Sequence, residues 1–164
     1  MRTRRLIVIV ILLCALPVGL WLLLRIVPPG YTRIDLMEAD KGPNLLSAVL
    51  QDGERVTLTW RNSQFGLDVT ETFFTRSGVI VQDRVVFAAP DGTPPPRVSV
   101  QDVDDLFHTG GAFDARGLSR PFTRIVYRIG EIGNPRLQVQ NRTIAFKEEA
   151  GFGGRVVQIG RAHV

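Results

Sequence analysis

Ser63 and Glu71 are the two residues whose types and spacing come closest to a catalytic pattern. A serine hydrolase needs a serine nucleophile, a histidine base and a carboxylate that orients the histidine. Ser63 would supply the nucleophile and Glu71 the carboxylate, but no histidine lies near either of them, and the chain has no Gly-x-Ser-x-Gly motif. The pattern therefore predicts a protein that is not an enzyme.

The histidines and the acidic residues do not have the spacing of a metal site. His108 lies in a glycine-rich stretch and His163 lies beside the C-terminal residue, and neither has a partner at ligand spacing. Asp102, Asp104 and Asp105 form the one acidic cluster, but the glycine and the final carboxylate of an EF-hand loop are missing after it. We expect solvated, helix-capping aspartates here, and neither a metal nor a cofactor.

The segment 105–121 is a candidate contact loop. It combines Phe107 and Phe113 with flexible glycines and with Arg116 and Arg120. Aromatic and arginine side chains are enriched in protein interfaces, and loops on a rigid scaffold often carry function. Two interpretations are open: the four residues form a partner-contact loop, or the phenylalanines cover the open end of a β-sandwich.

The elements that must position these residues have the pattern of β-strands. Apolar and polar residues alternate at 31–37, 56–61 and 67–73, which gives each strand one buried face. In the third of these, Leu67, Val69, Glu71 and Phe73 share a face. Ser77-Gly78 is expected to turn the chain into a strand that begins at Val79.

Further strands are expected after a long connection. They are predicted at 122–129, 137–140, 143–146 and 155–159, with a tight turn at Asn141-Arg142. The connection, 89–121, contains three consecutive prolines and is predicted to be irregular, with a short edge strand at Val98 and Val100 and half a helical turn at 103–107. The whole pattern predicts an all-β fold, either an antiparallel sandwich or a partly open barrel of seven or eight strands.

The start of the chain has the pattern of a membrane anchor. The stretch from Leu6 to Leu24 carries no charge, and as a helix it would span about 28 Å, close to the hydrocarbon thickness of a bilayer. Three arginines precede it, and basic residues stay on the cytoplasmic side. We expect residues 1–27 to be a cytoplasmic tip and signal-anchor helix in a bacterial cytoplasmic membrane, and 28–164 to be a periplasmic β-domain. A cleaved signal peptide is the alternative.

The charge balance excludes one class of partner. The chain has 20 basic and 16 acidic residues, but four of the arginines lie in the predicted anchor. The remaining chain is neutral overall, so it lacks the basic surface by which proteins bind the phosphate backbone of nucleic acids.

Several short motifs resemble the domain-of-unknown-function family eighteen-fifty over about residues 31–160. They are Trp60-Arg61-Asn62-Ser63 followed by Glu71, and the late Arg128-Ile129-Gly130. Ser63, Glu71, Arg128 and Gly130 keep the family pattern, while Asn62 stands where a histidine is usual, and the family's Gly-x-Gly segment is reduced to Asp91-Gly92-Thr93-Pro94. Asparagine does not exchange protons near neutral pH, which argues against acid–base chemistry.

The resemblance implies a setting and no reaction. Members are small all-β, membrane-anchored bacterial proteins, often found beside the membrane subunit of TRAP transporters that use a TAXI-class binding protein. It therefore predicts a non-enzymatic accessory protein that contacts the transporter's membrane subunit or its solute-binding protein. The alternative is a periplasmic ligand- or ion-binding sensor that uses Glu71 with Arg128, or the aspartate cluster. Asn62 and Ser63 complete the candidate binding residues.

Overall fold

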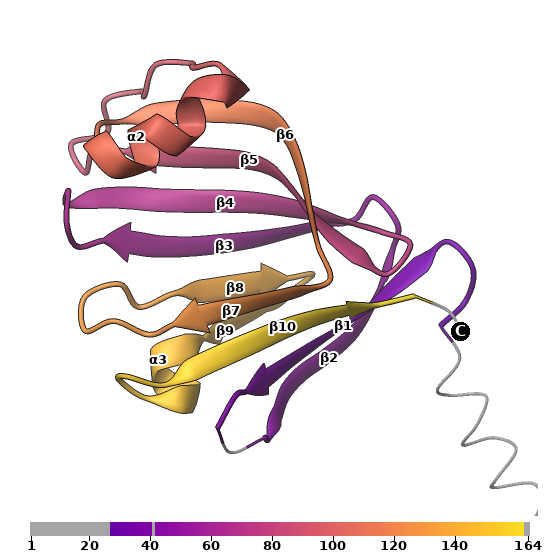
Figure 1. Ribbon diagram of the computed structural model, residues 1–164. Helices are drawn as coiled ribbons and strands as arrows, with labels where there is room; N and C mark the ends of the chain where they lie inside the picture. Colours follow the sequence, from indigo (N-terminus) through magenta and orange to yellow (C-terminus); the bar gives the residue numbers. More distant parts are fainter. Residues whose placement is uncertain (1–26, 41, 163–164) are drawn as a thin grey trace, which may run out of the picture.

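The computed structural model describes residues 27–40 and 42–162, which form two antiparallel β-sheets (Figure 1). The four-stranded sheet has the order β2-β1-β10-β7, with the bounds β2 Asn44–Gln51, β1 Tyr31–Glu38, β10 Arg155–Arg161 and β7 Arg124–Arg128. The six-stranded sheet has the order β6-β5-β4-β3-β8-β9, with the bounds β6 Phe113–Phe122, β5 Val79–Ala88, β4 Leu67–Arg76, β3 Arg55–Asn62, β8 Arg136–Val139 and β9 Arg142–Ala145.

The two sheets meet at one corner and diverge from it, so they form an open, sandwich-like arrangement (Figure 1). Thr123 alone separates β6 from β7, and there the chain passes from one sheet to the other. The turn between β4 and β5 packs at the same corner, where the backbone N–H of Gly78 donates to Thr32 Oγ1 of β1. Gly78 has a φ of +81°, and an added Cβ would lie 2.2 Å from the backbone nitrogen of Ala162, so only glycine fits this turn.

Two hydrophobic cores share the inner face of the six-stranded sheet. Strand alternation puts Leu67, Val69, Glu71 and Phe73 of β4 on one face. Phe73 belongs to the core between the two sheets, while Leu67 and Val69 belong to a second core under helix α2 (Val103–Thr109). Glu71 therefore lies at the boundary between the cores.

Three short helical segments complete the described residues. The 3₁₀ turn η1 (Val100–Asp102) leads into α2, which covers the β5–β6 part of the sheet (Figure 1). Helix α3 (Phe146–Ala150) follows β9 and places Phe146, fully buried, in the core between the sheets. Among the helices of the described residues, none has the length and apolar character needed to cross a membrane.

The predicted β class is confirmed, but the predicted elements are incomplete. The described residues hold ten strands rather than seven or eight. The turn between β4 and β5 and the helical turn at 103–107 are confirmed, while β2, β6 and α3 were not predicted. The tight turn between β8 and β9 lies one residue earlier than expected, at Gln140-Asn141, with Gln140 at φ 54°. The predicted anchor falls on residues 1–26, outside the described part of the chain.

Candidate functional site

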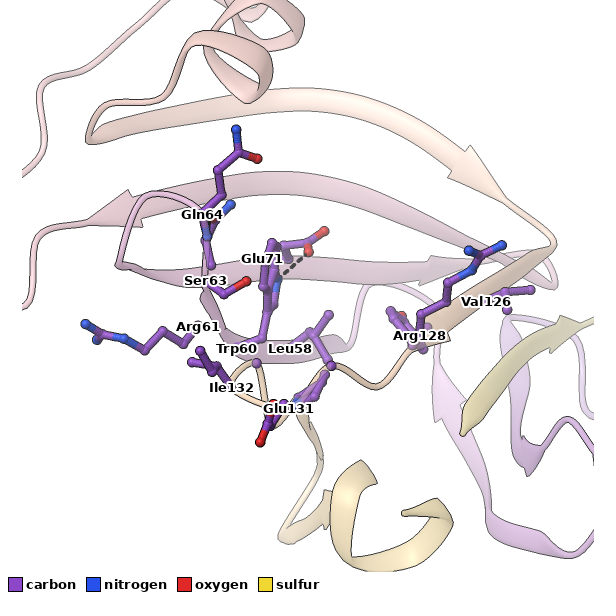
Figure 2. A pocket seen from close by; sticks show the side chains of 15 residues that line it. Leu58, Trp60, Arg61, Ser63, Gln64, Glu71, Val126, Arg128, Glu131 and Ile132 are labelled. Atoms are coloured by element: carbon purple, nitrogen blue, oxygen red, sulfur yellow. Dashed lines mark hydrogen bonds between the residues drawn. The ribbon is translucent and has the colours of Figure 1, made fainter. Parts of the chain in front are cut away.

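A pocket of about 650 Å³ lies between the sheets at the boundary of the two cores (Figure 2). Its floor is the inner face of β3 and β4, where Leu58, Trp60 and Glu71 lie next to one another. One wall is β7 with the loop that follows it, and the β3–β4 turn closes one end. The pocket forms here because α2 covers one part of the inner face, the four-stranded sheet covers another, and the strip between them stays open.

Glu71 is the one carboxylate on this floor, and neutral groups hold it. Trp60 Nε1 donates to Glu71 Oε1 at 2.9 Å, and Gln82 Nε2 donates to Glu71 Oε2 at 2.6 Å. Burial raises the pKa of Glu71 above its usual 4.5, and the hydrogen bonds from Trp60 and Gln82 oppose this shift without cancelling it. The carboxylate therefore ionises less readily than an exposed glutamate.

Tyr127 stands beside Glu71 in the wall of the pocket. Its hydroxyl donates to Gln158 Oε1 at 2.6 Å, and its ring packs against Phe146 with centroids 5.2 Å apart. Burial, and then the negative charge of Glu71, raise the pKa of Tyr127 well above its usual 10.0. Tyr127 therefore stays protonated at neutral pH and offers the pocket an aromatic ring rather than a charge.

The four binding residues predicted from the sequence all line this pocket: Asn62, Ser63, Glu71 and Arg128. Ser63 and Arg128 are exposed at the rim (Figure 2). Asn62 has a structural role, since its Oδ1 accepts from the backbone N–H groups of Gln64 and Phe65 and shapes the β3–β4 turn. The four positions thus share one pocket, but the hydrogen bonds of Glu71 go to Trp60 and Gln82 rather than to Asn62 or Ser63.

The segment predicted as a contact loop is mostly secondary structure, the end of α2 and most of β6, while its contact with a partner is untested. Phe113 begins β6, is fully buried and stacks on Phe87 at 4.8 Å between ring centroids. Phe107 of α2 is partly buried and meets Phe87 edge to face at 5.1 Å. Both phenylalanines belong to the second core, packed with Phe87.

The two arginines of this segment form ion pairs within the fold. Arg120 Nη2 lies 2.8 Å from Asp104 Oδ1 and links β6 to α2, and Arg116 Nη2 lies 2.8 Å from Asp114 Oδ2 on the outer face of the sheet. Arg84 also binds Asp114, with Nε 2.7 Å from Oδ1. The arginine partners hold the pKa of Asp114 well below its usual value of 3.8. Contact of Arg116 or Arg120 with a partner stays a prediction.

In the acidic cluster at the start of α2, the side chain of Asp104 has a partner, as does that of the nearby His108, while Asp102 is the N-cap of α2 without a capping hydrogen bond from its side chain. Asp104 pairs with Arg120, as above, and His108 Nδ1 lies 2.7 Å from the backbone oxygen of Asp104. Among the described residues, no three His, Cys, Asp or Glu side chains lie close enough together to hold a metal ion.

Sequence reasoning missed three residues that build the site: the Trp60 indole as a donor, Gln82 and Tyr127. One signal was present, because Glu71 shares a strand face with Leu67, Val69 and Phe73, and a carboxylate on an apolar strand face needs a donor or a cavity. Gln82 reaches Glu71 through the pairing of β4 with β5, and Tyr127 reaches it across the two sheets; no local pattern contains either relation.

The fold and the pocket define a class of protein: an open antiparallel β-domain of two sheets. A half-buried carboxylate, Glu71, lines the pocket at the edge of its main core. Comparison of the chain with family models, with curated proteins and with solved structures gave no match in any of the three. The resemblance to family eighteen-fifty therefore stays a prediction from the short motifs.

Proposed function

We propose that this protein is a non-enzymatic ligand-binding domain whose pocket between the two sheets takes a small molecule. The observation that carries the proposal is the pocket itself, about 650 Å³ in volume, with a carboxylate, two aromatic rings and apolar side chains in its lining. Small-molecule sites are concave and mostly apolar, with a few polar groups that fix the orientation of the ligand. The floor follows that composition, with Leu58 and Trp60 beside Glu71. The rim is more polar and carries Arg61, Arg128 and Glu131.

The lining argues for binding rather than for catalysis. The residues around the pocket include no histidine and no cysteine, and Ser63 lies on an exposed turn. Each oxygen of Glu71 already accepts a hydrogen bond from a neutral donor, which suits a fixed recognition group.

A screen with a blocked pocket tests this proposal. Full-length protein is mixed with a chemically diverse fragment library, and binding is followed by ligand-observed NMR. Ser63 lines the pocket from the exposed β3–β4 turn, so Ser63→Trp should fill the mouth and abolish the binding that wild type shows. Ser63→Ala is the matched control and should keep it. Equal binding to wild type and Ser63→Trp, or no binding to wild type, would contradict the proposal.

A second role, from the resemblance, concerns the setting. We propose that the domain is held at the cytoplasmic membrane on the periplasmic side, as an accessory to a TRAP-type transporter membrane subunit or its solute-binding protein. An apolar rim favours a protein partner, because Ile132 is 60% exposed and Val126 44% exposed beside the pocket.

Photo-cross-linking tests this second role. A photoreactive residue at position 132 should capture the transporter subunit or its binding protein in intact cells, and the same residue at the exposed Asn141 should not. Fractionation of the same cells tests the anchor, since a buried helix would keep the protein in the membrane pellet after a high-salt wash. Release into the soluble fraction would count against the anchor and the setting.

A further inference from the structure

Glu71 differs in its partners from other carboxylates that the fold withdraws from water. Asp35 Oδ1 lies 2.9 Å from Arg33 Nε, and Asp114 Oδ1 lies 2.7 Å from Arg84 Nε. The donors to Glu71, the Trp60 indole and the Gln82 amide, carry no charge. An ionised carboxylate removed from water without a cation costs free energy, and a cation at the site offsets that cost.

The open side of Glu71 faces the pocket, so a cation that enters it reaches the carboxylate. Arg61, which also lines the pocket, is paired with Asp68, with Nη1 2.8 Å from Oδ1. Arg128 lies at the exposed rim (Figure 2). An ionised Glu71 therefore makes the floor of the pocket negative, and the arginines of the lining, Arg61 and Arg128, lie at its edge.

The other groups around Glu71 suit an organic cation better than a metal ion. Trp60 and Tyr127 both line the pocket beside the carboxylate, and aromatic rings attract alkylammonium groups through their quadrupoles. Leu58 in the floor and Val126 and Ile132 at the rim supply apolar surface. Hard metal ions need several oxygen ligands, whereas one carboxylate with two rings matches an amine that carries a hydrocarbon chain.

We propose that the pocket binds a small organic amine, with its ammonium group at Glu71 beside Trp60 and Tyr127 and its hydrocarbon part against Leu58 and the apolar rim. The inference rests on the proposed ligand-binding function and names the class of its ligand. The ammonium group replaces part of its hydration by a charge-assisted hydrogen bond to the carboxylate, and the hydrocarbon part leaves water.

Three compounds of similar size and different charge test the class of ligand. They are 3-phenylpropylamine, 3-phenylpropan-1-ol and 3-phenylpropionate, titrated into the full-length protein by calorimetry at pH 7. A hydrogen bond to a charged group predicts that the amine binds about tenfold to a hundredfold more tightly than the alcohol, and the carboxylate most weakly. Binding of the alcohol or the carboxylate as tight as that of the amine would overturn the inference.

The titration and the fragment screen together separate failure of the inference from failure of the proposed function. If the fragment screen finds ligands that Ser63→Trp blocks but the amine binds no better than the alcohol, the pocket binds another class and only the inference is lost. If the screen also finds none, both are lost.

A charge swap across one hydrogen bond tests the role of Glu71. Glu71→Gln should weaken the amine about tenfold or more and leave the alcohol unchanged. The double variant Glu71→Gln with Gln82→Glu keeps a carboxylate–amide hydrogen bond between β4 and β5 but moves the carboxylate to a residue outside the pocket lining. It should unfold like wild type and still bind the amine weakly. Recovery of wild-type amine affinity in the swap would overturn the inference.

Glu131→Gln is the matched control for charge, because Glu131 is an exposed glutamate at the rim of the same pocket. Loss of the Glu131 charge should change the affinity for the amine by less than about twofold, since exposed charges interact weakly in water. A loss as large as that of Glu71→Gln would mean that the general field of the rim, not the floor carboxylate, attracts the amine, and would overturn the assignment to Glu71.

Arg128 tests whether the ligand carries a carboxylate next to its ammonium group. Homophenylalanine carries the 3-phenylpropylamine skeleton with a carboxylate added beside the amine, so it is compared with 3-phenylpropylamine on wild type and on Arg128→Gln. Tighter binding of homophenylalanine that Arg128→Gln removes supports an amino-carboxylate ligand, and weaker binding supports an amine without a carboxylate. Both results require the ammonium group at Glu71, and binding of either compound that survives Glu71→Gln unchanged would overturn it.

Discussion

Glu71 and Asp114 are carboxylates of the same six-stranded sheet, but they lie on opposite faces and have different partners. Asp114 is on the outer face, where Arg84 and Arg116 bind it, and 8% of its side chain is exposed. Glu71 is on the inner face, where an indole and an amide bind it. The carboxylate of Asp114 thus has positively charged partners, whereas that of Glu71 has neutral hydrogen-bond donors.

The partners decide the direction of each pKa shift. The arginines lower the pKa of Asp114 far enough that it is ionised over the whole physiological range. Burial raises the pKa of Glu71, because its neutral donors do not compensate the desolvation of the charged form. Asp114 is therefore part of an ion cluster that stabilises the sheet, whereas Glu71 is bound by neutral donors, and we propose that a ligand supplies its cation.

The largest effect on stability is expected from Phe87, because its ring contacts residues next to both Glu71 and Asp114. Phe87 of β5 meets Trp60 edge to face at 6.0 Å and stacks on Phe113, the neighbour of Asp114. Phe87→Ala should lower the free energy of unfolding by about 3–5 kcal/mol, because a fully buried aromatic ring leaves a cavity. Urea unfolding monitored by circular dichroism measures the loss.

Val86→Ala is the control for Phe87→Ala, since Val86 is the next residue on β5, points to the outer face and is partly buried. Val86→Ala should lower the free energy of unfolding by about 1 kcal/mol or less. Equal costs for the two variants would show that the inner face under α2 does not carry the core described above.

Removal of the ion cluster is expected to have the next largest effect. Asp114→Asn should lower the free energy of unfolding at pH 7 by about 1–2 kcal/mol, between the values for exposed and buried pairs, because Arg84 and Arg116 are 37% and 49% exposed and water screens them. The folded pKa of Asp114 is lowered, so the stabilisation is present above about 3.8 and is lost as the pH falls below that value. Urea unfolding between pH 2 and pH 7 measures both.

Asp68→Asn is the matched control for the ion cluster. Asp68 pairs with Arg61 at 2.8 Å, but the two side chains are 56% and 41% exposed. This change should cost about 0.5 kcal/mol or less. If Asp68→Asn were the more costly of the two, the difference in burial would not explain the role of Asp114.

The class of fold could be predicted from the sequence because strand alternation is local. The faces of β3 and β4 follow from Val56, Leu58, Leu67 and Val69, and the glycine at 78 marks the turn that follows. Strand β6 could not be predicted, since its apolar positions Phe113, Ala115 and Leu118 are interrupted by glycine and arginine. Its position is determined by the pairing with β5 and by the cover of α2, which are long-range contacts.

Part of the pocket lining could be predicted from the sequence. Short motifs pointed to Ser63, Glu71 and Arg128, and these do line one pocket. The difference between Glu71 and Asp114 was not readable, because it depends on cross-strand neighbours: Gln82 stands opposite Phe73 on β5, and Arg84 stands beside Asp114 only through the pairing of β5 with β6.

The pH dependence of stability should distinguish the two carboxylates by sign. The folded pKa of Glu71 is raised, so the folded state holds the proton more tightly, and its contribution is full below the unfolded value of about 4.5 and is lost as the pH rises toward the folded pKa. The loss has a slope of at most about 1.4 kcal/mol per pH unit within that window. Subtracting the profile of Glu71→Gln from that of wild type isolates this contribution, and Tyr127 does not interfere because its pKa lies well above 10.0.

Asp114→Asn provides the crossed control for the pH profile. It should keep the decline above about pH 4.5 that belongs to Glu71 and lose only the acid limb, while Glu71→Gln should do the reverse. A Glu71→Gln profile parallel to that of wild type above pH 4.5 would show that the carboxylate is solvated in the folded state, which removes the basis of the comparison.

The smallest expected effect comes from one donor to Glu71. Trp60→Phe keeps an aromatic ring at the pocket and removes the indole N–H that donates to Glu71 Oε1. Because that hydrogen bond favours the ionised carboxylate, its loss should raise the pKa of Glu71 further and cost about 1 kcal/mol at neutral pH. The titration of the Glu71 side-chain carboxyl carbon, followed by NMR in wild type and variant, measures the direction.

Tyr127→Phe is the control that separates a lost donor from a disturbed pocket. The Tyr127 hydroxyl donates to Gln158 and not to Glu71, so its removal should leave the donors of Glu71 in place. If both variants raised the pKa of Glu71 equally, burial alone would determine that pKa, and the indole N–H of Trp60 would have no specific effect on it. If Trp60→Phe alone raised it, then the neutral donors hold the carboxylate close to ionisation, and a cation in the pocket has only a small remaining cost to overcome.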